Sequence, residues 1–248
     1  MIYFVGAGSG DPELITLKGY KLLQEADLVV WAGSLVNEEV LEYTKKGAKL
    51  VNSAHLDLEE IVEVMAAAYN KGENVVRLHT GDPSLYGAIG EQIEMLKQKG
   101  IPFKIVPGVS SFLAAAASIQ KEYTIPDATQ TVIITRMEGR TPVPAKENLA
   151  GLAAHGSSMA IFLSVGMIEQ VVRQLLEGYS PDTPAAVVEK ASWPEERILT
   201  GTLANLAQLT KDAGITKTAL ILVGNFLKDT GKSKLYDKEF THEFREGK

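Results

Sequence analysis

Residues 2–12 have the sequence IYFVGAGSGDP, in which an apolar run leads into three closely spaced glycines and an Asp-Pro pair. The run Ile2–Val5 is typical of a buried strand, because its residues are large and uncharged. The glycines permit positive φ angles, which allow a tight turn or the close approach of a ligand to the backbone. Asp11 and Pro12 are residue types that commonly begin a helix. Strand, glycine-rich loop and helix in this order predict the start of an α/β domain.

Outward from this stretch, apolar runs alternate with helix-period segments through the first half of the chain. The runs that predict buried strands are Ile2–Val5, Leu28–Trp31, Ala48–Val51, Val75–Leu78 and Phe103–Val106. The segments that predict helices are Leu14–Glu25, Leu58–Asn70, Leu85–Lys99 and Phe112–Ser118. Such alternation predicts a mostly parallel sheet with helices on its faces.

A second series follows a polar, proline-containing segment at Gln120–Gln130. Its predicted strands are Thr131–Thr135, Met159–Leu163, Ala185–Glu189, Arg197–Thr200 and Ala219–Val223. Its predicted helices are Lys146–Ala154, Met167–Glu177 and Leu203–Asp212. The sequence therefore predicts two α/β domains with mostly parallel sheets, at residues 1–119 and 120–228, followed by a polar tail at 229–248.

The composition narrows the functional classes. The chain has 248 residues, a formal net charge of −6 and no cysteine, which excludes disulfides, a thiolate nucleophile and Cys-ligated metal centres. An acidic balance argues against nucleic-acid backbones as partners, although a few arginines in one site can still hold carboxylates. No basic segment precedes the first apolar run, and no stretch is long enough to cross a bilayer. We therefore expect a cytoplasmic protein without membrane or nucleic-acid partners.

Three further loops follow predicted strands, at the sheet edge where open α/β sheets bind ligands. Residues 80–87 are TGDPSLYG, in which Asp82 can accept hydrogen bonds from a ligand or simply cap the next helix. Residues 107–111 are PGVSS, whose small residues admit a flat ligand, with an ordinary serine N-cap as the alternative. Residues 136–144 are RMEGRTPVP, a long loop that fits carboxylate binding and a solvated charged loop about equally well.

Several catalytic motifs are missing. The four histidines, at positions 55, 79, 155 and 242, do not have metal-ligand spacing, so we expect no metal site. Neither a GxSxG elbow nor a GxxxxGK[ST] loop occurs. The dinucleotide fingerprint needs glycine where the chain has Asp11, whose charge would repel a pyrophosphate. An NAD(P)-dependent oxidoreductase and a non-catalytic α/β binding module are the alternatives that the residues leave open.

Five segments in this order resemble the tetrapyrrole methylase family of methyltransferases. They are VGAGSGDPELITLKG at 5–19, LHTGDPSLYG at 78–87, VPGVSS at 106–111, FLSVG at 162–166 and ALILVG at 219–224. WAGSLV at 31–36 and TRMEGRTP at 135–142 resemble the branch that methylates carbon 11 of precorrin-4 or cobalt-precorrin-4 in cobalamin biosynthesis. The uroporphyrinogen-III methyltransferase branch, the runner-up, usually carries Asp in place of Ala32.

The resemblance implies S-adenosylmethionine as cofactor, with S-adenosylhomocysteine as its product, bound in a cleft between the two domains of a homodimer. It implies cofactor contacts at Thr80, Gly81, Asp82, Leu85, Ser110, Ser111, Val165 and Ala191. The tetrapyrrole, a polycarboxylate, is expected to meet the glycine-rich loop and basic side chains at Gly8, Ser9, Gly10, Asp11, Lys18, Arg136 and Arg140. An electron-rich pyrrole carbon can attack an activated methyl group without an elaborate acid–base pair, so no catalytic residue is nominated.

Overall fold

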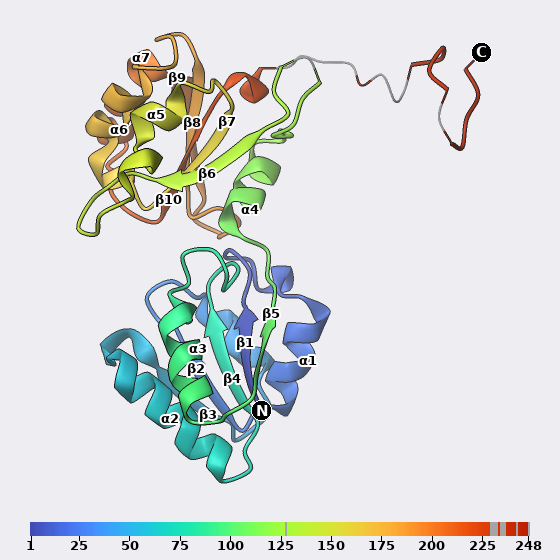
Figure 1. The fold of residues 1–248 in the computed structure, drawn as a ribbon, viewed down its shortest axis with the longest axis vertical. Helices are drawn as coiled ribbons and strands as arrows, with labels where there is room; N and C mark the ends of the chain where they lie inside the picture. Colours follow the sequence, from blue (N-terminus) through green and yellow to red (C-terminus); the bar gives the residue numbers. More distant parts are fainter. Residues whose placement is uncertain (127, 229–232, 234–236, 242, 248) are drawn as a thin grey trace. The chain divides into compact units, whose positions relative to one another are not determined.

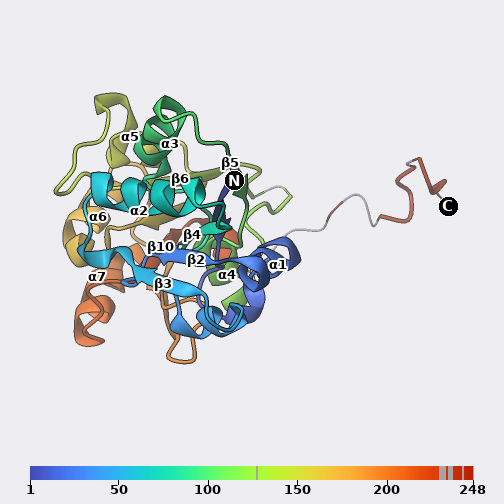
Figure 2. The same cartoon turned by 90° about the horizontal axis from the view of Figure 1, so that it is seen from below.

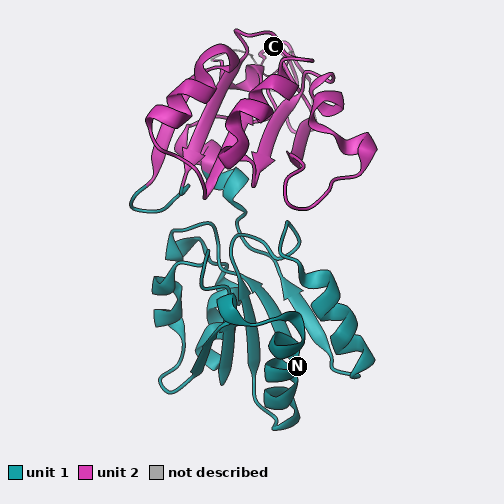
Figure 3. Cartoon of the chain, turned by 90° about the vertical axis from the view of Figure 1, so that its left-hand side faces the viewer, with its two compact units in different colours: residues 1–114, 190–195 teal, residues 115–189, 196–248 magenta. Residues whose placement is uncertain are grey.

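The structure is a computed structural model that describes residues 1–126, 128–228, 233, 237–241 and 243–247. These residues form two compact units, coloured separately in Figure 3. The first unit contains Met1–Ala114 together with Lys190–Glu195, and the second contains Ala115–Glu189 and Glu196–Lys248. The six residues 190–195 therefore belong to the first unit although their sequence neighbours belong to the second.

The first unit is built on a parallel five-stranded sheet with the strand order β3-β2-β4-β1-β5. Its strands are β1 (Ile2–Gly6), β2 (Leu28–Trp31), β3 (Lys49–Asn52), β4 (Val75–His79) and β5 (Phe103–Val106). Its helices are α1 (Leu17–Glu25), α2 (Leu58–Asn70) and α3 (Ile89–Gln98), and α4 (Ser111–Ser118) begins there and runs into the second unit. Helix α1 covers one face of the sheet, and α2 and α3 cover the other (Figure 1; Figure 2).

Alternation along β1 explains this three-layer arrangement. Ile2 and Phe4 pack in the core beneath α2 and α3, whereas Val5 packs on the opposite face with Leu23 of α1. Successive side chains of a strand point to opposite faces, so an apolar run without polar interruptions requires cover on both. Because all five strands are parallel, the loops that follow β4, β1 and β5 emerge at one edge of the sheet.

The second unit contains a mixed sheet with the strand order β6-β7-β10-β8-β9. Its strands are β6 (Val132–Arg136), β7 (Ser158–Phe162), β8 (Pro184–Glu189), β9 (Arg197–Thr202) and β10 (Ala219–Val223). Its helices are α5 (Leu149–Ala153), α6 (Ile168–Leu175) and α7 (Leu203–Asp212). Only β6 and β7 pair in parallel; the β7–β10, β10–β8 and β8–β9 pairs are antiparallel.

The predicted α/β class is confirmed, with three local corrections. Parallel pairing prevails in the first sheet, but in the second it is confined to one pair, because β8 turns directly back into β9. The helix predicted from Leu14 begins at Leu17, where the Thr16 side chain accepts a hydrogen bond from the Gly19 amide. The helix predicted from Leu85 begins at Ile89, because the chain first passes through a turn with positive φ at Tyr86 and Ala88.

The units of the structure divide between Ala114 and Ala115, so the predicted boundary after residue 119 stays a prediction. Within the predicted polar tail, residues 229–248, positions 229–232, 234–236, 242 and 248 lie outside the described residues. Among the described residues, no helix combines the length and apolar character needed to cross a membrane.

Candidate functional site

Three loops meet at the carboxyl edge of the first sheet, and glycines make their close approach possible. A Cβ atom at Gly108 would lie 2.1 Å from the Gly81 carbonyl oxygen and 2.8 Å from the Gly6 Cα. A Cβ atom at Gly6 would lie 2.5 Å from that same carbonyl oxygen. The Gly81 amide donates to the Gly8 carbonyl at 2.7 Å. The loops after β1, β4 and β5 therefore pack backbone against backbone.

Asp82 braces this loop cluster. Its Oδ2 accepts a hydrogen bond from the Gly108 amide at 2.8 Å, and its Oδ1 accepts bonds from the Ser84 amide and hydroxyl. Partial burial raises the pKa of Asp82, but the hydrogen bonds from Ser84 and Gly108 outweigh it and hold the pKa below its ordinary value. Asp82 therefore caps the turn at Ser84 and not the next helix, α3, whose N-cap is Ala88. The carboxylate keeps lone pairs with which to accept from a ligand.

The glycine-rich loop at residues 8–11 is held from two directions. Trp193 donates from Nε1 to the Ser9 carbonyl at 3.0 Å, and the Ser192 hydroxyl lies 2.8 Å from the Ser9 hydroxyl. The Asp11 amide donates to the Ser192 hydroxyl at 3.1 Å. From elsewhere in the unit, the buried Asn37 side chain donates to the Gly10 carbonyl at 2.9 Å. Asp11 itself accepts from the Glu13 amide and caps a short 3₁₀ helix, η1 (Pro12–Leu14).

A cavity of about 320 Å³ lies beside the β4 loop. Thr80 and Leu85, two predicted cofactor contacts, line it together with the buried side chains of Arg77 and His79. Ala32 and Leu35 from the 31–36 segment contribute to its wall. The cavity thus joins two stretches of sequence that the family resemblance singled out separately.

Arg77 and His79 are the two side chains of this cavity whose pKa values are lowered by burial. Arg77 donates to Gln92 Oε1, the Val30 carbonyl and the Ser53 hydroxyl, and burial lowers its pKa to about 10. The His79 ring stacks on Phe4, and its Nε2 is a buried atom without a hydrogen-bond partner among the described residues. Burial, with the charge of Arg77 as a smaller contribution, lowers the pKa of His79 to about 3, so the imidazole is neutral near pH 7.

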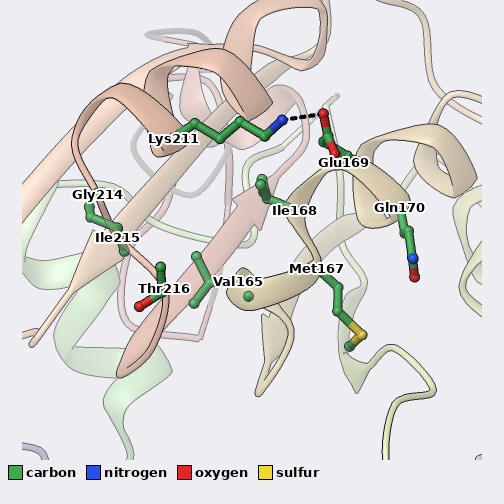
Figure 4. Close-up of a pocket in the computed structure, with 10 residues that line it drawn as sticks. Val165, Met167, Ile168, Glu169, Gln170, Lys211, Gly214, Ile215 and Thr216 are labelled. Carbon is green, nitrogen blue, oxygen red and sulfur yellow. Dashed lines mark hydrogen bonds and ion pairs between the residues drawn. The ribbon is translucent and has the colours of Figure 1, made fainter.

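The second unit has its own cavity of about 310 Å³, shown in Figure 4. Val165, a predicted cofactor contact, lines it at the start of the 3₁₀ helix η5 (Val165–Met167), which follows β7. Lys211 forms an ion pair with Glu169 at this cavity, drawn as a dashed line in Figure 4. Leu163, two residues before Val165, is 67% exposed and has positive φ.

Arg136 and Arg140 have different surroundings. The Arg136 guanidinium donates to the carbonyls of Thr141 and Pro142 at 3.1 and 2.7 Å, and so closes its own loop. Arg140 is exposed, and the structure gives its side chain no ion pair with any described residue. Lys18 is likewise exposed on α1. Of the three predicted basic residues, Arg140 and Lys18 are therefore exposed and can reach a carboxylate, whereas Arg136 shapes the loop that carries Arg140.

The remaining predicted residues separate into two groups. Ser110 is buried beside Gly81, with its Cα 3.5 Å from the position of a Gly81 Cβ, and Ser111 begins α4. Ala191 is buried in the first unit, next to Ser192. Val165 alone among the predicted cofactor contacts belongs to the second unit. The structure thus gathers Gly81, Asp82 and Ser110 around the glycine cluster and assigns Val165 to a separate cavity.

Four residues of this region were not predicted from the sequence: Asn37, Arg77, Ser192 and Trp193. Asn37 directly follows the 31–36 segment, and Arg77 interrupts an otherwise apolar strand; both were weak signals. No local pattern indicates that Ser192 and Trp193 contact residues 9–11, because more than 180 residues separate the partners.

The chemistry that these residues allow is binding and orientation. The glycine cluster presents backbone amides and carbonyls, the Asp82 carboxylate and small serines, which suits a ligand with hydroxyl, amino and carboxylate groups. Among the described residues, no group of three or more His, Asp or Glu side chains is placed to hold a metal ion.

Comparisons with known proteins agree on one family. The family model for tetrapyrrole (corrin/porphyrin) methylases matches residues 1–207. The cobalt-precorrin-4 C(11)-methyltransferase of Methanocaldococcus jannaschii is 59% identical over 98% of this chain and 95% of its own length. A crystal structure of a cobalt precorrin-4 methyltransferase, a cobalamin biosynthetic enzyme, superposes with a TM-score of 0.90 at 49% identity over 92% of this chain and 95% of that one.

A more distant relative was solved with a ligand. The uroporphyrin-III C-methyltransferase of Thermus thermophilus, in complex with S-adenosyl homocysteine, superposes with a TM-score of 0.77 at 29% identity. The superposition covers 94% of this chain and 96% of that one.

Proposed function

The chain belongs to the tetrapyrrole methylase family, and from this premise we propose that it transfers a methyl group from S-adenosylmethionine to carbon 11 of precorrin-4 or cobalt-precorrin-4. The methyltransferase of M. jannaschii, 59% identical over nearly the whole chain, supports this substrate in preference to uroporphyrinogen-III. The 31–36 and 135–142 segments, which resemble the same branch, support it independently.

The observation that carries the proposal is the glycine cluster at the carboxyl edge of the first sheet. Gly6, Gly81 and Gly108 bring three loops together so closely that a Cβ atom at Gly6 or Gly108 would overlap the Gly81 carbonyl oxygen. Ligands of open α/β sheets bind at this edge. A loop cluster fixed by its own backbone is preorganised, so ordering it costs a ligand little binding free energy.

The cofactor contacts that we propose rest on the motif match of each residue. In the first unit they are Thr80, Gly81, Asp82, Leu85, Ser110, Ser111 and Ala191, and in the second Val165. When bound, S-adenosylmethionine supplies a methyl group already activated by its positively charged sulfur. Asp82 keeps the Gly108 loop in place and offers its remaining lone pairs to a hydroxyl or amino group.

The role of the protein in such a transfer is geometric. The reacting ring carbon must lie in line with the methyl–sulfur bond that breaks. Holding two reactants in such an orientation accelerates their reaction strongly. The substrate contacts that we propose are Gly8, Ser9, Gly10, Asp11, Lys18, Arg136 and Arg140. The exposed Lys18 and Arg140 supply positive charge to a polycarboxylate, and Arg136 holds the loop in shape.

Calorimetric titration with S-adenosylhomocysteine, with NADH as the parallel ligand, tests the proposal first. We expect one S-adenosylhomocysteine per chain with a micromolar dissociation constant and no NADH binding. Incubation with S-adenosylmethionine and either precorrin-4 or cobalt-precorrin-4 should then add one methyl group to the tetrapyrrole and release S-adenosylhomocysteine, both detected by mass spectrometry. Absence of S-adenosylhomocysteine binding would refute the proposal, and NADH binding in its place would favour an oxidoreductase.

We further propose that the protein is a cytoplasmic homodimer. The family resemblance supports the dimer, and the acidic, cysteine-free composition fits a reducing compartment. Sedimentation equilibrium on the purified protein tests the dimer directly, because the monomer mass is 26.8 kDa.

A further inference from the structure

The segment Lys190–Glu195 is a preformed turn. Lys190 and Ser192 both have positive φ, and the Trp193 amide donates to the Lys190 carbonyl at 2.9 Å. The Lys190 ammonium lies 5.6 Å above the Trp193 ring centre and 3.5 Å from a Glu195 carboxylate oxygen. Non-glycine residues with positive φ persist only where surrounding contacts hold them, so the conformation of this turn is specified.

This turn directs two side chains at the glycine-rich loop. The Asp11 amide donates to the Ser192 hydroxyl, which in turn lies in hydrogen-bond contact with the Ser9 hydroxyl. The Trp193 indole N–H donates to the Ser9 carbonyl. These bonds engage the backbone on both sides of Gly10, a residue that has no side chain of its own with which to fix its position.

The indole ring also explains why residue 10 is glycine. A Cβ atom there would lie 2.2 Å from Trp193 Cδ1, well inside van der Waals contact. The Gly10 carbonyl is bound by the Asn37 side chain. Residues 9–11 are therefore fixed by partners from two distant parts of the sequence.

We propose that Ser192 and Trp193 are positioning residues that hold residues 8–11 in the conformation that receives the tetrapyrrole. The inference rests on the proposed function, because that function makes these residues part of the substrate site. Loops that contact substrate gain affinity when they are held in the bound conformation beforehand. Loss of these bonds should therefore weaken substrate binding and leave the fold of the first unit intact.

Two variants and one matched control test the proposal. Trp193→Phe keeps an aromatic ring over Gly10 but removes the N–H donor, and Ser192→Ala removes the hydroxyl shared by Ser9 and Asp11. Glu195→Gln removes an exposed ion pair of the same turn and leaves these bonds in place. We expect each of the first two variants to raise the KM for the tetrapyrrole about tenfold, the usual cost of one lost hydrogen bond. The S-adenosylhomocysteine dissociation constant should stay within about twofold of wild type, and the control should change neither quantity.

Hydrogen exchange at the Asp11 amide gives a measurement independent of activity. Ser192→Ala should accelerate exchange at this amide, because its acceptor is gone, while amides in the centre of β1 exchange as in wild type. Unchanged exchange at Asp11, an unchanged KM, or an equal loss of tetrapyrrole and S-adenosylhomocysteine affinity would each overturn the proposal. A wild-type protein that neither binds S-adenosylhomocysteine nor methylates the tetrapyrrole would instead refute the proposed function. The exchange rate of the Asp11 amide would still show whether Ser192 holds this part of the loop.

Discussion

Two loop systems of this protein are held in place by opposite means. In the first unit, the glycine cluster packs backbone on backbone, with Gly108 close to both Gly6 and Gly81. In the second unit, the Arg136 guanidinium ties the loop at residues 136–144 together by binding two carbonyls of that loop. A Cβ atom at Gly6 or Gly108 would overlap backbone, whereas shortening Arg136 removes hydrogen bonds and adds no overlap. The proposed function assigns the first system to the cofactor and the second to the tetrapyrrole.

The largest effect should follow from adding one methyl group to the glycine cluster. Gly108→Ala places a Cβ atom 2.1 Å from the Gly81 carbonyl oxygen, and only backbone movement can relieve the overlap. We expect the free energy of unfolding, measured by urea denaturation, to fall by about 3 kcal/mol or more. S-Adenosylhomocysteine binding should be lost as well.

Gly90→Ala is the matched control for this substitution. Gly90 lies in α3, and a Cβ atom there would meet nothing within 4 Å. Because alanine has a higher helix propensity than glycine, the free energy of unfolding of this variant should be higher by about 0.5–1 kcal/mol. A Gly108→Ala variant that loses less than about 1 kcal/mol would show that the loop cluster can yield.

The second effect, of intermediate size, is the change of the free energy of unfolding with pH. The two units differ here in the kind of polar group that they bury. Buried His79 has a folded-state pKa of about 3 against 6.5 when unfolded, so between these values the unfolded chain binds more protons. Stability is therefore complete above about pH 6.5 and falls as the pH drops, by about 2 kcal/mol at pH 5. The buried Ser158 and Thr210 of the second unit carry hydroxyls, which do not titrate in this range.

Urea denaturation at pH 7.5 and pH 5 measures this difference. His79→Gln should remove about 2 kcal/mol of the pH dependence, whatever the stability of the variant at pH 7.5. If His79→Gln kept the full pH dependence, the imidazole would not be the responsible group.

The smallest effect belongs to the second loop system. Arg136→Ala should raise the tetrapyrrole KM about tenfold, equivalent to about 1.4 kcal/mol, because the loop loses both carbonyl bonds. Arg136→Lys should rescue little, since an ammonium group cannot reproduce the fork of a guanidinium. Affinity for S-adenosylhomocysteine should not change; a matching loss of that affinity would contradict the assignment.

Arg140→Ala is the companion variant in the same loop. Its side chain is exposed, so we expect only a two- to threefold rise in KM, about 0.5 kcal/mol, that disappears at high salt. A salt-independent effect as large as that of Arg136→Ala would mean that both arginines contact the substrate directly.

Local physics made much of the fold predictable. Helix α2 has the predicted bounds because Asp57 and Glu60 form a capping box at its start. Strands β2 and β10 also coincide with their apolar runs, since a chain buried on both faces leaves a continuous signal. The family motifs located the glycine cluster, because they contain the glycines themselves.

Features set by distant partners were not predictable. The antiparallel turn from β8 to β9 passes through a segment without a hairpin signature, so the mixed second sheet was missed. Arg77 lies in an apolar strand, and nothing near it in the sequence indicates that its guanidinium donates hydrogen bonds to Gln92 and Ser53. The two carbonyls that bind Arg136 belong to its own loop, but nothing in their sequence distinguishes them from other carbonyls.

The membership of residues 190–195 in the first unit also has a consequence during synthesis. The ribosome completes the sheet of that unit by Val106, yet the partners of Ser9 and Asp11 emerge only after residue 190. At typical translation rates of about 5–20 residues per second, the glycine-rich loop waits roughly 4–17 s for them. A nascent chain halted within this interval would lack the bonds that Ser192 and Trp193 make to residues 9–11, so the sheet of the first unit is complete before the site that we propose for the substrate.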